Sequence, residues 1–236
     1  MKKCKWSVLK AQNDGKELNL EVEDQRYIDK VIRHLNSHKN GMMETEIVRK
    51  DLLGLAAEAK EEGVTLEQKI GPVKEFGETL AVEGKDEDQK ERWYYFLWQI
   101  GIIYMIVPVV LFIEIVLLKF MGSELEEVRF NVPVSLALLL LPTLLEVYLV
   151  FFRYRFILAG RMGRIFGVVE TCIPYLLMIG VIYFRPNFKQ MPGGNLYVPD
   201  AFWVLFGALA VGAYVYGRKK FFGFAEKIAE NHHLEL

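Results

Sequence analysis

The sequence predicts an all-α protein in which a small cytoplasmic helical domain precedes a four-helix transmembrane bundle. Charge is concentrated at the N-terminal end: residues 1–92 hold 17 Lys and Arg and 20 Asp and Glu, whereas residues 93–236 hold 12 and 10. Apolar residues recur at helical spacing before residue 80, and long apolar segments follow it. We therefore divide the chain into a cytoplasmic domain with its connector (1–92), a transmembrane domain (93–217) and a cytoplasmic tail (218–236).

Four apolar segments are long enough to cross a bilayer, which requires about 20 residues each. They cover residues 94–118, 132–152, 165–184 and 201–216. The connector 153–164 (RYRFILAGRMGR) carries four arginines and no acid, and the tail begins with Arg218, Lys219 and Lys220. Because cationic connectors stay in the cytoplasm, this pattern places both chain termini on the cytoplasmic side of the cell membrane.

Helical periodicity and helix-end signals define the cytoplasmic domain. The stretch DQRYIDKVIRHLNSHK is amphipathic, as is ETEIVRKDLLGLAAEAKEEG, which Gly63 can terminate in a left-handed conformation. Thr65 and Gln68 fit a capping box for a short helix, and the Gly71-Pro72 break precedes another amphipathic segment. Residues 1–23 allow two interpretations. The NDG at 13–15 favours a β-hairpin, and a helix running into DQRYIDKV is the alternative that we slightly prefer.

Residues 24–82 resemble the HAAS domain, a small helical cytoplasmic domain of bacterial membrane proteins. The resemblance rests on YIDKVIRHLNSHK, on EIVRKDLLGLAAEAKEEGVTLEQKI and on GPVKEFGETL. Such domains commonly precede several transmembrane spans, mainly in Gram-positive bacteria. Their genes often lie beside those of PadR-type regulators or ABC transporters. The resemblance implies a sensing or regulatory role at the membrane, and it brings no catalytic residues.

Two carboxylates stand inside the most apolar segments. Glu146 follows Pro142 in LLLLPTLLEVYLVFF, and Glu170 precedes Pro174 in VVETCIPYLLM. If the two spans are antiparallel neighbours, the glutamates lie at a similar depth, with the prolines one turn deeper. Ionisable groups at such positions face water or a partner. Their role is open: they are a structural pair of polar groups, or a cation or proton site that opens to the cytoplasm.

Small residues in the third and fourth spans allow close helix packing. Gly163 and Gly167 form a GxxxG pair, and Ala208 with Gly212 and Ala213 with Gly217 form small-xxx-small pairs. Packing within the bundle is the simpler interpretation, and homodimerisation is the alternative.

Several functional classes find no support in the sequence. The acidic N-terminal domain argues against nucleic acid as a partner. His34 and His38 lie one turn apart without a third ligand nearby, so we predict no metal site. No HExxH, GxSxG, Walker A or dinucleotide-binding motif occurs. We therefore predict a protein without enzymatic activity or cofactor that regulates or assists a protein partner through residues 1–92. The alternative is a small ion-coupled or proton-coupled transporter or channel.

Overall fold

The computed structural model describes residues 4–37, 41–80, 86–120, 130–151 and 160–234. Every secondary-structure element of more than one residue within these ranges is a helix, which confirms the all-α prediction. The chain forms two compact units. Unit 1 comprises Met1–Tyr95, Phe151–Val168 and Lys219–Leu236, and unit 2 comprises Phe96–Val150 and Val169–Arg218. The helices α6 (Asp86–Phe120) and α9 (Asp200–Asn231) contribute residues to both units.

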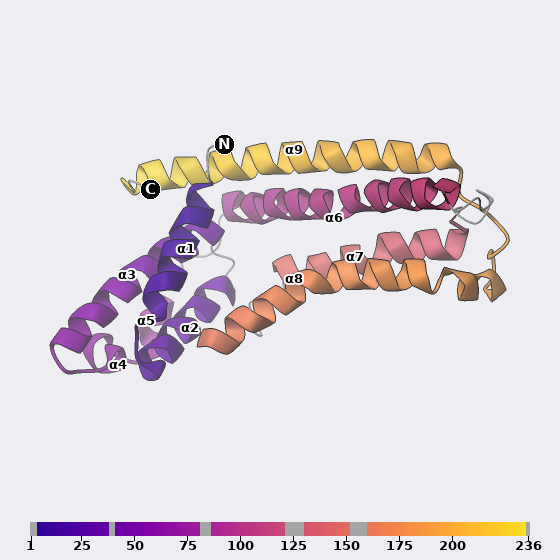
Figure 1. Ribbon diagram of the computed structural model, residues 1–236. Coiled ribbons are helices and arrows are strands. Elements are labelled where there is room, and N and C mark those ends of the chain that lie inside the picture. The colour runs from indigo at the N-terminus through magenta and orange to yellow at the C-terminus, as the bar shows by residue number, and fades with distance from the viewer. Residues whose placement is uncertain (1–3, 38–40, 81–85, 121–129, 152–159, 235–236) are drawn as a thin grey trace. The chain divides into compact units, whose positions relative to one another are not determined.

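Unit 1 contains five helices from the N-terminal part of the chain. These are α1 (Lys5–Glu17), α2 (Val22–Ser37), α3 (Met42–Glu61), α4 (Leu66–Ile70) and α5 (Val73–Leu80) (Figure 1). The helix α3 packs against α1, α2 and α4, and α2 also packs against α4 and α5. The core combines apolar side chains from α2, α3 and α4. Its buried members are Tyr27, Ile28, Val31, Leu35, Leu52, Leu53, Ala56 and Leu66. Burial of each aliphatic side chain contributes about 1.5–3 kcal/mol, so these short helices are stable only as a group.

The helix ends of unit 1 follow local sequence signals. Gly63 follows the end of α3 with φ of 72°, a left-handed conformation that glycine adopts without steric cost. Thr65 and Gln68 form the predicted capping box at the start of α4. Gly71 ends α4 with φ of 99°. These three features confirm the helix boundaries expected between residues 61 and 73.

The β-hairpin considered for residues 1–23 is wrong. The stretch NDG lies inside α1, and the chain bends only between α1 and α2. Asn13 is buried and donates hydrogen bonds to the main-chain carbonyl of Glu46 at 2.8 Å and to its carboxylate at 2.9 Å. This tertiary contact outweighs the local turn preference of the NDG stretch.

Unit 2 contains parts of α6 and α9, all of α7 (Val132–Phe151) except its last residue, most of α8 (Gly160–Tyr183) and the 3₁₀ helix η3 (Arg185–Gln190). The segments before α7 and α9 are joined by an isolated antiparallel bridge between Asn131 and Tyr197. The Asn131 side chain also accepts a hydrogen bond from the Val134 N–H at 3.1 Å, which caps α7. Phe130 packs edge-on against Trp203 with ring centroids 5.3 Å apart. These contacts fix the ends of α7 and α9 to each other.

Two helices among the described residues are long and apolar enough to cross a membrane. They are α7 and the Ala201–Asn231 part of α9. The apolar part of α8, Cys172–Tyr183, is shorter. Exposed apolar side chains cover α7 and α9, with Leu144 63% exposed and Val204 75% exposed. Such a surface is costly in water and is suited to lipid.

Candidate functional site

The carboxylate of Glu91 binds the start of α3. Glu91 lies near the beginning of α6 and is completely buried. Its two oxygens accept hydrogen bonds from the main-chain N–H groups of Met42 at 2.8 Å and Met43 at 3.1 Å. The first N–H groups of a helix have no partner within the helix and carry partial positive charge. Gly41, the residue that precedes α3, supplies no side-chain cap. Glu91 therefore replaces the local cap and joins α6 to α3.

Further contacts join the same end of α6 to α1, α2 and α9. Arg92 donates a hydrogen bond to the Asn36 side chain at 3.1 Å. Trp6 packs edge-on against Tyr95 and against Phe221, with ring centroids 5.7 Å apart in each pair. Tyr95 and Phe221 also pack together at 5.2 Å. We call Glu91, Arg92, Trp6, Tyr95 and Phe221 the junction. All five residues belong to unit 1.

A second polar cluster fixes α1 to α3. The Arg49 guanidinium pairs with Asp14 at 2.8 Å, with Glu46 at 3.2 Å and with Glu17. Burial alone would lower the pKa of Arg49, but Glu46, Glu17 and Asp14 raise it above its ordinary value. A guanidinium presents several N–H donors in a fixed plane, so one arginine can satisfy three carboxylates. Arg49 therefore holds the charges of this largely buried cluster together.

Asp29 of α2 borders this cluster and titrates near neutral pH. Burial and the Glu17 carboxylate raise its pKa to about 6, while Arg33 and Arg49 act in the opposite direction. Its Oδ2 atom is buried and has no hydrogen-bond donor among the described residues. The charge of the Asp29 carboxylate therefore changes within the range of pH 5 to 7.

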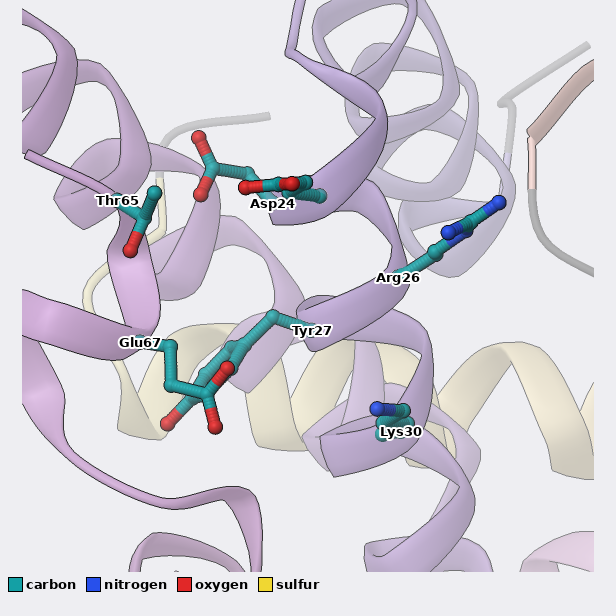
Figure 2. Close-up of a pocket in the computed structure, with 7 residues that line it drawn as sticks. Asp24, Arg26, Tyr27, Lys30, Thr65 and Glu67 are labelled. Atoms are coloured by element: carbon teal, nitrogen blue, oxygen red, sulfur yellow. The ribbon is translucent and has the colours of Figure 1, made fainter.

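A polar pocket of about 280 Å³ lies between the start of α2 and α4 (Figure 2). The Asp24 carboxylate accepts a hydrogen bond from the Leu66 N–H at 2.8 Å, and the Tyr27 hydroxyl donates to the Gly71 carbonyl at 2.9 Å. These bonds fix α4 against α2. The pocket is lined by Glu23, Asp24, Arg26, Tyr27, Lys30, Thr65 and Glu67.

The residues predicted to form an intramembrane site lie on two helices of unit 2. Glu146 and Pro142 are buried on α7, and Glu146 is 6% exposed. Pro174 is buried on α8, whereas the side chain of Glu170, on the same helix, lies outside the described part of the chain. Glu146 lies close enough to Tyr175 of α8 to interact with it electrostatically. The arrangement of the two glutamates relative to each other therefore stays a prediction.

A tyrosine of α6 supports the proline-containing region of α7. The Tyr104 hydroxyl lies within hydrogen-bond distance of both the Leu139 carbonyl and the Thr143 hydroxyl. The Thr143 hydroxyl itself donates to the Leu139 carbonyl at 2.6 Å. Pro142 has no N–H to donate to the Leu138 carbonyl, and these hydroxyls bind at Leu139, the next residue of the same helical turn. Sequence reasoning did not single out Tyr104.

A close approach of two helices in unit 2 involves Gly101, a glycine that sequence reasoning did not select. A Cβ atom added at Gly101 of α6 would lie 2.5 Å from the Tyr214 nitrogen and 2.8 Å from the Ala210 carbonyl oxygen of α9. A Cβ at Gly212 would meet no atom within 4 Å. The predicted packing residues are distributed differently. Gly163 and Gly167 lie on α8 with surroundings outside the described part, Ala208 and Gly212 are exposed, Ala213 is half-buried and Gly217 is buried.

The described residues contain no group of three His, Cys, Asp or Glu side chains placed to hold a metal ion. His34 lies on α2, and His38 lies outside the described residues. Comparisons with protein-family models, with curated proteins and with solved structures find no match. The resemblance of residues 24–82 to the HAAS domain therefore stays an expectation from the sequence.

Proposed function

We propose that this chain is a non-enzymatic integral membrane protein that regulates or assists a protein partner, and that it couples an event in the membrane to a cytoplasmic contact made by residues 1–92. The observation that carries the proposal is the buried Glu91 carboxylate on the start of α3. A helix that extends toward an apolar segment thereby holds the N-terminus of a helix in the small domain directly.

The physical basis of this coupling is the continuity of α6 between Glu91 and Gly101, a stretch of helix without proline. The helix contains 35 residues, which corresponds to about 52 Å at 1.5 Å per residue. Its hydrogen bonds to α3 are charge-assisted and buried, so they are stronger than ordinary ones. A shift or rotation of the apolar part of α6 is therefore transmitted to α3, and the aromatic contacts of Trp6 and Tyr95 transmit it to α1.

The membrane topology that we propose has four spans, in α6, α7, α8 and α9, with both termini in the cytoplasm. It extends the finding that α7 and α9 are long and apolar enough to cross a membrane. Single-cysteine variants at positions 123, 156 and 193, made in a Cys4→Ser, Cys172→Ser background, test it. A membrane-impermeant maleimide applied to intact cells should label positions 123 and 193 and leave 156 unlabelled. Labelling of 156, or of all three positions, would contradict the topology.

The coupling proposal is tested by quantitative purification of the full chain from its native host. Wild type, Glu91→Ala and the control Glu61→Ala are extracted in mild detergent, and the co-purifying proteins are quantified by mass spectrometry. Glu61 is an exposed acid near the end of α3 and lies away from the junction. We expect one defined protein at near-stoichiometric amounts, at least threefold less with Glu91→Ala and unchanged with Glu61→Ala. Recovery of the chain alone, or equal recovery after removal of residues 1–92, would contradict the proposal.

A second function, an ion-coupled or proton-coupled transporter or channel, is supported by the burial of Glu146 in an apolar helix. A buried carboxylate within a membrane commonly marks an ion or proton pathway. In this case, Glu146→Gln and Glu170→Gln should abolish cation flux in proteoliposomes while the protein keeps its gel-filtration profile. Normal flux in both variants would exclude this function.

A further inference from the structure

The pocket between α2 and α4 has rigid walls. Asp24 is 6% exposed and is bound through Oδ1 to the Leu66 N–H. Its other carboxylate oxygen has no hydrogen-bond partner among the described residues, although the side chain lines the pocket. The Tyr27 side chain is 4% exposed and is bound to the Gly71 carbonyl. The pocket therefore presents a fixed carboxylate and an aromatic ring without any rearrangement of the chain.

The pocket carries a formal charge of −1, because three acids and two cations line it. Glu23, Asp24 and Glu67 line it, and within the described part of the chain none of these three carboxylates forms a salt bridge. In Figure 2 the Arg26 guanidinium points away from the Asp24 and Glu67 carboxylates. Lys30, the other cation of the lining, likewise forms no salt bridge among the described residues.

The same unit pairs other carboxylates with its own cations. Arg49 pairs with three acids, and Lys69 pairs with Glu58 at 3.2 Å and with Glu62 at 2.7 Å. The Glu67 carboxylate instead faces Tyr27: burial, followed by the Glu67 charge, raises the pKa of that tyrosine. Figure 2 shows the two side chains next to each other. Unlike the carboxylates of the neighbouring clusters, those of the pocket form no ion pair with a cation among the described residues.

We propose that this pocket receives an arginine side chain of the protein partner. The proposal rests on the proposed function, because it specifies the chemistry of the contact that residues 1–92 make. A volume of about 280 Å³ lies just below the range of roughly 300–1,000 Å³ typical of small-molecule sites, so it suits a single long side chain. A planar guanidinium bonds to two carboxylates at once and stacks on an aromatic ring. The described residues hold no three-ligand metal site that would favour an ion instead.

Saturation-transfer NMR with the full chain in detergent micelles tests the proposal. The probe is acetyl-arginine amide, and acetyl-citrulline amide is its uncharged match. In 150 mM KCl and at millimolar probe concentration, we expect saturation transfer from the protein to the side-chain protons of acetyl-arginine amide. The saturation transfer to acetyl-citrulline amide should be at least fivefold weaker. Glu67→Gln should weaken arginine binding at least threefold. The control Glu78→Gln, which removes an exposed acid of α5 outside the pocket lining, should leave it unchanged.

Equal transfer to arginine and citrulline would overturn the proposal, as would equal binding by wild type and Glu67→Gln. Glu67 is exposed and makes no described hydrogen bond through its side chain, so its substitution spares the fold. Asp24→Asn is a second variant, and it should weaken binding further. The arginine-binding proposal and the proposed function can be refuted independently of each other. A partner that is recovered equally by wild type and Glu67→Gln excludes the pocket alone. Arginine binding by a chain that recovers no partner excludes the proposed function alone.

Discussion

Removal of the Glu91 carboxylate should open the start of α3. In Glu91→Ala, the N–H groups of Met42 and Met43 lose their acceptor in a buried environment. A hydrogen bond to a charged group contributes about 1.5–3 kcal/mol, and loss of a helix cap costs about 0.5–2 kcal/mol. The two bonds share one carboxylate, so their contributions are not additive. We therefore expect the free energy of local opening at the start of α3 to fall by about 3 kcal/mol.

Hydrogen–deuterium exchange of the full chain in nanodiscs measures this loss. A decrease of about 3 kcal/mol in the opening free energy corresponds to roughly 150-fold faster exchange of the amides at the start of α3. Glu91→Gln keeps one acceptor oxygen and should lie between wild type and Glu91→Ala. The matched control is Glu61→Ala, which removes an exposed acid at the other end of α3, the helix whose exchange is measured. Exchange in Glu91→Ala within twofold of this control would refute the reasoning.

Three further predictions concern the charged cluster and the helix packing. Asp29→Asn should stabilise unit 1 by about 1 kcal/mol at pH 7.5, a value reduced for its partial exposure. The folded-state pKa of about 6 lies above the ordinary 3.8, so the cost of the charged carboxylate is complete above pH 6 and disappears as the pH falls from 6 to 4. Thermal unfolding against pH should show this gain in wild type and not in the variant. Arg49→Met should cost about 3–5 kcal/mol, because it leaves its acidic partners uncompensated, and should release α1 in exchange measurements. Gly101→Ala should cost about 1–3 kcal/mol in thermal unfolding, whereas Gly212→Ala should cost less than about 0.5 kcal/mol.

Local signals in the sequence were sufficient for much of unit 1. Gly63, the capping box of Thr65 and Gln68, and Gly71 each act within a few residues, so their sequence context determines the result. Asn13 shows the opposite case. Its stretch resembles a turn, but a hydrogen bond to a residue 33 positions away places it inside a helix.

The functional contacts that were missed are all long-range. Glu91 lies in a run of charged residues, and its sequence neighbourhood indicates only a solvated connector. Its role depends on α3, which begins 49 residues earlier. Gly101 is a single glycine in an apolar segment, and only the approach of α9 makes its missing Cβ matter. Glu146 could be selected from sequence because a charge in an apolar segment is unusual wherever the chain folds.

The central claim is that α6 transmits a change in the membrane to the small domain. Exchange at the start of α3, compared between Gly101→Ala and Gly212→Ala in nanodiscs, tests it most directly. The Gly101 substitution displaces α6 from α9, and the Gly212 substitution adds the same methyl group in open space. We predict at least fivefold faster exchange of the Met42 and Met43 amides in Gly101→Ala, with no change in Gly212→Ala. Equal exchange at these amides in both variants and wild type, with thermal unfolding showing that Gly101→Ala does perturb the helices, would contradict the coupling.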